Sequence, residues 1–162
     1  MKNKIKKIVF LILINLFVTS NLFSEEINFE ANSIELIDKD NKIIAKKNVK
    51  IFNQNETIYA NEMDYDKSKQ IIKARGDVRI ENLDENLEIL GDELTYFKEE
   101  EKITLNKNVK INFQKSIFFN TNKIIYDKLK NQIVVNSFSN FKDKFGNEVS
   151  SKESRFYLEK NY

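Results

Sequence analysis

Residues 58–80 read IYANEMDYDKSKQIIKARGDVRI, and the pattern of this stretch returns about every 30 residues along the chain. Its opening is a large apolar residue, any residue and a small one, and the same opening begins at Phe29, Ile89, Phe119 and Val149. A period of this size is typical of supersecondary units that stack on one another. The sequence therefore predicts a repeat protein of about four and a half units.

Each unit also has a second segment with its own pattern. Ile72-x-Ala74-x-x-x-Val78-x-Ile80 matches residues 43–51 and 103–111, and residues 133–141 match it more loosely. Apolar and polar residues alternate within these segments, which indicates half-buried β-strands. Turn clusters of Asn, Asp and Lys separate the segments at intervals of about 15 residues. We expect an all-β fold of repeated antiparallel hairpins with about nine strands.

The spacing inside the first segment predicts a bend. In pairs such as Ala60/Met63 and Gly91/Leu94 the small residue and the next apolar residue are separated by an odd number of positions, so a regular strand would place them on opposite faces. A bulge at the same place in each hairpin would resolve this conflict and would curve the sheet into a trough with an apolar inner wall. The aromatic rings at one recurring position would then form a ladder of neighbours: Tyr65, Tyr96, Tyr126 and Phe156. The same residues also fit a small β-roll with a filled core.

Residues 1–24 have the pattern of a secretory signal peptide. Four lysines lie within the first seven residues, and an apolar core of about 11 residues follows at 8–18. This core is short for a membrane-spanning helix, which needs about 20 apolar residues, although an uncleaved anchor that runs to Phe23 is an alternative. We expect export, cleavage near Ser24 and a mature domain of residues 25–162.

The composition argues against catalysis. The chain has no His and no Cys, so it lacks the most frequent general base, a thiol nucleophile, soft metal ligands and any disulfide. Acidic pairs such as Asp64/Asp66 suggest a glycosidase or a calcium site, but they recur at turns and on polar faces, as a solvated surface does. Removal of the leader takes away four lysines and no acid, which changes the formal net charge from +2 to −2 and leaves no basic block for nucleic acid. We expect no enzymatic activity, no cofactor and no metal.

The paired segments resemble a known family. Residues 60–65 (ANEMDY) followed by 72–80 (IKARGDVRI), and their counterparts Gly91 to Tyr96 and Asn108 to Ile111, are similar to the OstA-like (LptA-type) lipopolysaccharide-transport domain. The resemblance covers roughly residues 27–157. It departs from the family pattern where Lys47, Lys107 and Ser137 stand in place of the usual glycine, which is present only as Gly76, and where the fourth unit has Ser139 in place of valine.

The resemblance implies an open, twisted β-jellyroll with an apolar inner trough and a role in outer-membrane biogenesis. It implies a periplasmic protein of a Gram-negative bacterium that binds lipopolysaccharide, shields its acyl chains and bridges the inner to the outer membrane. The implied partners are other OstA-like domains, namely an inner-membrane-anchored partner and the outer-membrane assembly protein, and also further copies in a head-to-tail homo-oligomer. Two alternatives remain. The first is the N-terminal domain or a fragment of the outer-membrane assembly protein, because the chain ends at Tyr162 after one strand of a fifth unit. The second is a structural secreted β-repeat stalk or filament.

The repeated apolar positions give a predicted lipid-binding wall. It consists of Ile34, Leu36, Ile43, Val49, Ile51, Met63, Tyr65, Ile72, Val78, Ile80, Leu94, Tyr96, Ile103, Val109, Ile111, Ile124 and Tyr126. The segments Ile27 to Leu36 and Val149 to Leu158 are the predicted edge strands, because they lie at the two ends of the repeat. The predicted docking residues on these edges are Phe29, Ala31, Val149 and Phe156.

Overall fold

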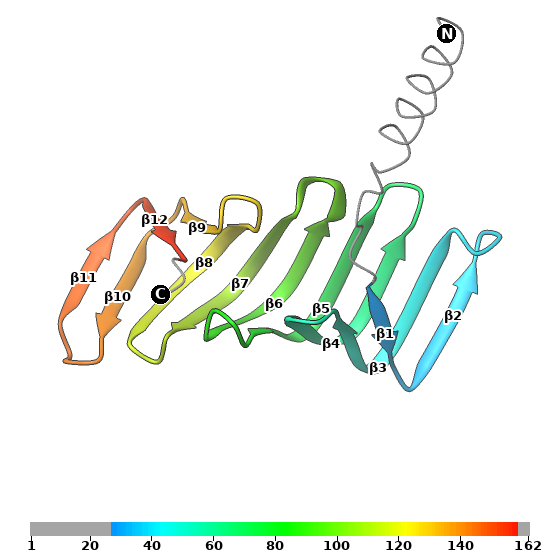
Figure 1. The fold of residues 1–162 in the computed structure, drawn as a ribbon, viewed down its shortest axis with the longest axis horizontal. Coiled ribbons are helices and arrows are strands. Elements are labelled where there is room, and N and C mark those ends of the chain that lie inside the picture. Colours follow the sequence, from blue (N-terminus) through cyan, green and yellow to red (C-terminus); the bar gives the residue numbers. More distant parts are fainter. Residues whose placement is uncertain (1–26, 159–162) are drawn as a thin grey trace, which may run out of the picture.

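A computed structural model describes residues 27–158. In this part of the chain all strands belong to one twelve-stranded antiparallel sheet, which Figure 1 shows running from β2 at one end to β11 at the other. The strands are β1 (Asn28–Glu30), β2 (Ser33–Ile37), β3 (Lys42–Phe52), β4 (Glu56–Asp66), β5 (Ile71–Asn82), β6 (Leu87–Phe97), β7 (Lys102–Phe113), β8 (Ile117–Asp127), β9 (Gln132–Val135), β10 (Ser139–Asp143), β11 (Glu148–Ser151) and β12 (Ser154–Tyr157). One short 3-10 turn, η1 (Lys98–Glu100), joins β6 to β7. The predicted signal peptide, 1–24, lies outside the described residues.

The six long strands, β3 to β8, each belong to two halves of the sheet, because the pairing register shifts in their middle. We call one half wall A. It contains the short strands β1, β10 and β11, the C-terminal parts of β3, β5 and β7, and the N-terminal parts of β4, β6 and β8. The other half, wall B, contains β2, β9 and β12 with the remaining parts of the long strands. The sheet is therefore one open, folded surface, and the two walls enclose the apolar core between them.

The bend between the walls is produced by residues with left-handed backbone. In β5 the pair Gly76-Asp77 has φ values of 77° and 48°, and the pairs Lys47-Asn48 in β3 and Lys107-Asn108 in β7 have the same conformation. Each pair lies opposite a single residue of one neighbouring strand, as in a β-bulge. The predicted bend is confirmed, because the pairing register of β4 shifts next to Ala60 and that of β6 shifts next to Gly91. The left-handed residues themselves, however, lie in the second segment of each unit.

Short polar side chains hold neighbouring strands together along this bend. Each contact joins two residues that are 16 positions apart, and most members are exposed. The pairs are Asn32–Asn48 (3.3 Å), Asn61–Asp77 (2.9 Å), Asp92–Asn108 (2.7 Å) and Thr121–Ser137 (2.6 Å). The outer side of the bend is thus polar, while the apolar residues on either side of it face the interior.

The turns at the two free margins of the folded sheet also stack on one another. We call the turns at 53–55, 83–86, 114–116 and 144–147 rim A, and the turns at 38–41, 67–70, 98–101 and 128–131 rim B. On rim B the amide of each turn donates to a carbonyl of the preceding turn, for example Lys98 N to Gln70 O (3.0 Å) and Lys128 N to Glu101 O (2.9 Å). Rim A does the same with Gln114 N and Asn86 O (2.8 Å). The repeat period is therefore fixed at the rims as well as at the bend.

Two details of the sequence-based expectation are wrong. The segments Ile27 to Leu36 and Val149 to Leu158 are not single strands: each splits into two, so β1 and β11 end wall A and β2 and β12 end wall B. The fourth unit does not form one bent strand either, because the chain leaves the ladder after Val135 and re-enters it at Ser139. These breaks raise the strand number of the described residues from the expected nine or so to twelve.

The bend explains why one unit keeps its glycine and gives a stability prediction. A Cβ added to Gly76 would lie 2.9 Å from Asn61 Nδ2 and would hold a φ of 77°, so Gly76→Ala should lower the free energy of unfolding by about 1–3 kcal/mol. Lys47 occupies the equivalent place at φ 63°, so Lys47→Gly should be neutral or stabilising by up to about 1 kcal/mol. Urea unfolding of both variants measures this difference. Equal losses in the two variants would show that the left-handed conformation does not matter for stability.

Candidate functional site

The inner face of wall A carries one unbroken row of apolar residues from edge to edge. Each residue of this row is the register partner of the next, strand by strand. The row consists of Phe29, Ile51, Ile58, Ile80, Ile89, Ile111, Phe119, Phe141 and Val149. Alternation of inner and outer side chains in every strand, combined with a fixed register, is what produces such a row.

Wall B carries a matching row, in which aromatic residues alternate with isoleucines. It consists of Leu36, Ile43, Tyr65, Ile72, Tyr96, Ile103, Tyr126, Ile133 and Phe156. The predicted ladder of aromatic neighbours is therefore wrong: an antiparallel hairpin places the second segment of each unit between two successive first segments. The rings contact the opposite wall instead, as Phe29 does with Tyr65 (centroids 5.7 Å apart) and Phe156 with Phe119 (4.7 Å).

All the residues of the predicted lipid-binding wall lie on this inner face. Those outside the two rows form shorter rows beside the bend, such as Val49 with Ala60 and Met63 with Ala74. The prediction missed Ile58, Ile89 and Phe119, although they open the repeat units. The signal is present in the sequence, but the bulge resets which alternate residues face inward, so the prediction leaves out the first parts of β4, β6 and β8.

Side chains fill the space between the walls. Ile72, Ile80, Ile89, Ile103 and Leu105 have no exposed surface, and the rest of the core in the middle of the sheet is also buried. The lining is thus continuous, as expected, but its two faces pack against each other rather than around an open channel. A guest that lies on this lining must separate the walls.

The inner rows become exposed at the two ends of the sheet. Ile34 and Leu36 on β2 are 48% and 55% exposed, and Val149 on β11 is 63% exposed. Phe29 on β1 and Phe156 on β12 are partly buried. These five predicted edge and wall residues therefore lie on end strands with an apolar side chain in line with the interior, whereas Ala31 lies on the link between β1 and β2. A second sheet placed against either end would continue the same rows.

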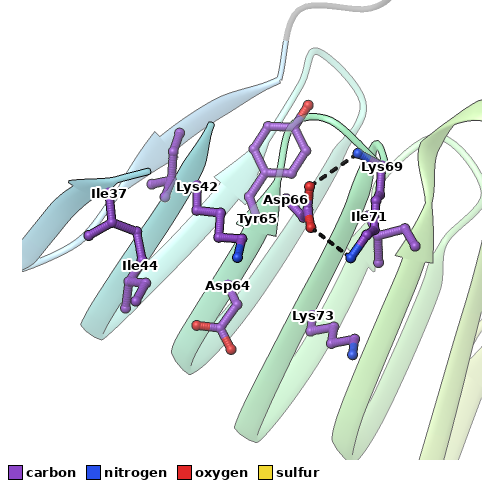
Figure 2. A pocket seen from close by; sticks show the side chains of 10 residues that line it. Ile37, Lys42, Ile44, Asp64, Tyr65, Asp66, Lys69, Ile71 and Lys73 are labelled. Carbon is purple, nitrogen blue, oxygen red and sulfur yellow. Dashed lines mark hydrogen bonds and ion pairs between the residues drawn. The ribbon is translucent and has the colours of Figure 1, made fainter. Parts of the chain in front are cut away.

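Figure 2 shows a separate cavity of about 280 Å³ near the β2 end of wall B. It is lined largely by outward-facing residues, including Ile44, Asp64 and Lys73, which are register partners across three strands. Asp66 at its margin accepts hydrogen bonds from Ser68 Oγ (2.7 Å) and Lys69 N (3.1 Å), and these bonds hold the pKa of Asp66 at about 2. The charge of Asp66 is satisfied within its turn, and Ile43 and Tyr65 are the members of the wall B row that line the cavity.

The described residues offer little for acid–base or metal chemistry. No group of three or more potential metal ligands occurs among them. Burial raises the pKa of the Tyr126 phenol, and the nearby Glu56 and Glu85 raise it further, so this hydroxyl stays protonated. Within residues 27–158 there is also no helix with the length and apolar character needed to cross a bilayer. The main feature of the described residues is therefore the pair of continuous apolar rows on the inner face.

Comparison with known proteins agrees with this arrangement. The model of the family described as LptA/(LptD N-terminal domain) LPS transport protein matches residues 28–132. No curated protein sequence matches the chain significantly. Among solved structures, LptH of Pseudomonas aeruginosa, the LptA homologous periplasmic component of the conserved lipopolysaccharide transport device, has a similar fold. The TM-score is 0.57 at 21% identity, over 64% of this chain and 76% of that chain.

The family match covers more than half of the sequence, and the similar structure has the same open, antiparallel architecture. The chain therefore belongs to the LptA/(LptD N-terminal domain) family of lipopolysaccharide transport proteins.

Proposed function

We propose that this protein binds lipopolysaccharide in the periplasm and shields its acyl chains on the way from the inner to the outer membrane. The observation that carries the proposal is the pair of apolar rows that run from one edge of the sheet to the other. A row that ended inside the sheet would suit a closed core. Rows that reach both edges suit a lining that continues into a neighbour.

The physical requirement is to keep several acyl chains out of water. Each buried methylene contributes about 0.8 kcal/mol, so exposure of one chain of about 12 carbons costs on the order of 10 kcal/mol. Isoleucine, valine and aromatic side chains offset this cost without any chemical step. The inner rows hold few polar groups, so acyl chains can slide along them rather than being trapped at one point. The sugar and phosphate groups remain outside, next to the polar rims.

Residues 1–24 fit this function as a signal peptide that directs export and is removed near Ser24. The mature domain is then residues 25–162. A second candidate role is supported by the family itself, whose model describes both LptA and the N-terminal domain of LptD. In that role the same lining would form the periplasmic entrance of an outer-membrane assembly protein. The two roles share the lipid and the lining, and differ in what the chain is joined to.

Two adjacent phenylalanines on β8 allow a matched test of lipid binding. Phe119 lies on the wall A row and is 2% exposed, whereas Phe118 faces outward and is 41% exposed. A photo-crosslinking benzoylphenylalanine in place of Phe119 should capture lipopolysaccharide in cells, because that ring lies between the walls. The same residue in place of Phe118 should capture little. Gel mobility and mass spectrometry of the adducts measure the difference.

Capture at both positions to the same extent would contradict binding on the inner face. Purified protein that carries no lipopolysaccharide and gives no adduct at Phe119 would favour the structural stalk instead.

The exposed ends of the rows predict head-to-tail assembly. Within the described residues, β1 and β11 are the two ends of wall A, so a second copy added in register would bring Phe29 close to Val149. The double variant Phe29→Cys/Val149→Cys should form disulfide-linked ladders under mild oxidation, since the natural chain has no cysteine. The control is Tyr59→Cys/Val149→Cys, in which one cysteine lies on the outer face of β4. Non-reducing gels with only monomer for the first pair, or equal ladders for both, would contradict this mode of assembly.

A further inference from the structure

Within residues 27–158, polar contacts join rim A to rim B across the opening between the walls. Lys128, in the rim B turn at 128–131, has its Nζ 3.3 Å from Oε1 of Glu56, the residue that follows the rim A turn at 53–55. Asn131 of the same rim B turn donates from Nδ2 to Oε1 of Glu85 in the rim A turn at 83–86, at 3.4 Å. The first pair is 72 residues apart in sequence and the second 46. We call these four residues the rim clasp.

Residues of the same wall hold Lys128 in place. Lys128 Nζ is also 3.5 Å from Oε2 of Glu101 in the neighbouring turn, and it lies 5.2 Å from the ring centroid of Tyr96. The hydroxyl of Tyr96 donates to the same Glu101 oxygen at 2.6 Å. The lysine is thus held by an ion pair and a cation–π contact on its own wall, and its contact to Glu56 reaches the other wall.

Burial of the lysine as well as of the acid distinguishes the Lys128–Glu56 pair from the Lys130–Asp127 pair, in which only Asp127 is buried. Glu56 is 7% exposed and Glu85 8%, and the side chain of Lys128 is 18% exposed. Charged groups at such depth need partners. By contrast, Lys130 of the same turn pairs with Asp127 at 3.6 Å while its own side chain is 69% exposed, and that pair stays within one wall.

The rims meet closely at this point. A space of only about 10 Å³ remains there, next to Ile51, Ile58, Glu56 and Lys128. An acyl chain therefore cannot pass between the rims at this point while the clasp is closed. Elsewhere the walls are held together by apolar contacts, such as Phe119 with Phe156, which a lipid acyl chain can replace by equivalent ones.

We propose that the rim clasp is a lateral gate: the walls part between rim A and rim B, and the Lys128–Glu56 and Glu85–Asn131 contacts control how often they do so. A polar link suits this role, because water solvates the separated charges and offsets much of the lost attraction. The statement that the gate admits lipid rests on the proposed function. The statement that the clasp limits separation of the walls is independent of the proposed function.

The first experiment measures separation of the walls without lipid. A thiol is introduced on the inner face by Ala74→Cys, a position that is 2% exposed in wall B, and its alkylation rate is followed in dilute urea. Lys128→Gln should raise the rate roughly three- to tenfold, because the ion pair between Lys128 and Glu56 across the opening is then lost. Lys130→Gln, on the same turn, is the matched control and should leave the rate nearly unchanged. The rate must also depend on urea less steeply than global unfolding does.

An unchanged rate in Lys128→Gln, or a rise that follows global unfolding, would overturn the gate.

The second experiment closes the gate permanently. Glu56→Cys/Lys128→Cys is joined by a short bis-maleimide, and uptake of fluorescent lipopolysaccharide is compared with that of Thr95→Cys/Thr104→Cys treated in the same way. The control pair consists of outer-face register partners on one wall. The clasp cross-link should slow uptake at least tenfold relative to the control. Equal, rapid uptake by both cross-linked proteins would refute the gate and leave the proposed function intact. If no form took up lipopolysaccharide, including the untreated protein, the proposed function would be refuted. The alkylation experiment alone would then decide whether the clasp limits separation of the walls.

Discussion

Two consecutive residues with left-handed backbone in the middle of a long strand are the constraint on which this structure depends. They occur in β3, β5 and β7, and they let one strand contribute to two walls while keeping its apolar side chains inside both. In the neighbouring β4 both Ala60 and Met63 face the interior despite their odd spacing, and the left-handed pair of β3 lies opposite the single residue Asn61 between them. The bend also brings the two rims toward each other, which places Lys128 next to Glu56.

A packed interior is compatible with a transport role because the sheet is polar at its bend and rims and apolar on its inner surface. The bend and the rims are polar, as the Asn61–Asp77 contact and the stacked turns show. The inner rows are apolar throughout, so contacts between the walls can be exchanged for contacts with acyl chains at little net cost. A lining that packs against itself when empty avoids exposure of a large apolar surface to water. Its ends at Leu36 and Val149 stay exposed, which suits continuation into another domain.

The repeat made much of the fold predictable, because a recurring apolar position becomes a row once the register is fixed. The bend followed from the spacing of Ala60 and Met63, but its left-handed residues did not, since Lys47 and Lys107 occupy a conformation usually reserved for glycine. The direction of each strand's side chains was ambiguous on either side of the bulge, which is why Ile58 and Ile89 were missed. The clasp had no local signal, because its paired members are 72 and 46 residues apart and meet only across the opening between the walls.

Isoleucine methyl NMR tests the central claim most directly, because this chain carries isoleucines on both faces of the same strands. Ile58, Ile80 and Ile89 lie on the inner rows, whereas Ile44, Ile71 and Ile125 face outward. Saturating lipopolysaccharide should give nuclear Overhauser contacts between its acyl protons and the inner methyl groups, with none to the outer set. Contacts confined to the outer methyl groups, or an inner set unaffected by the lipid, would contradict the inner rows as the binding surface.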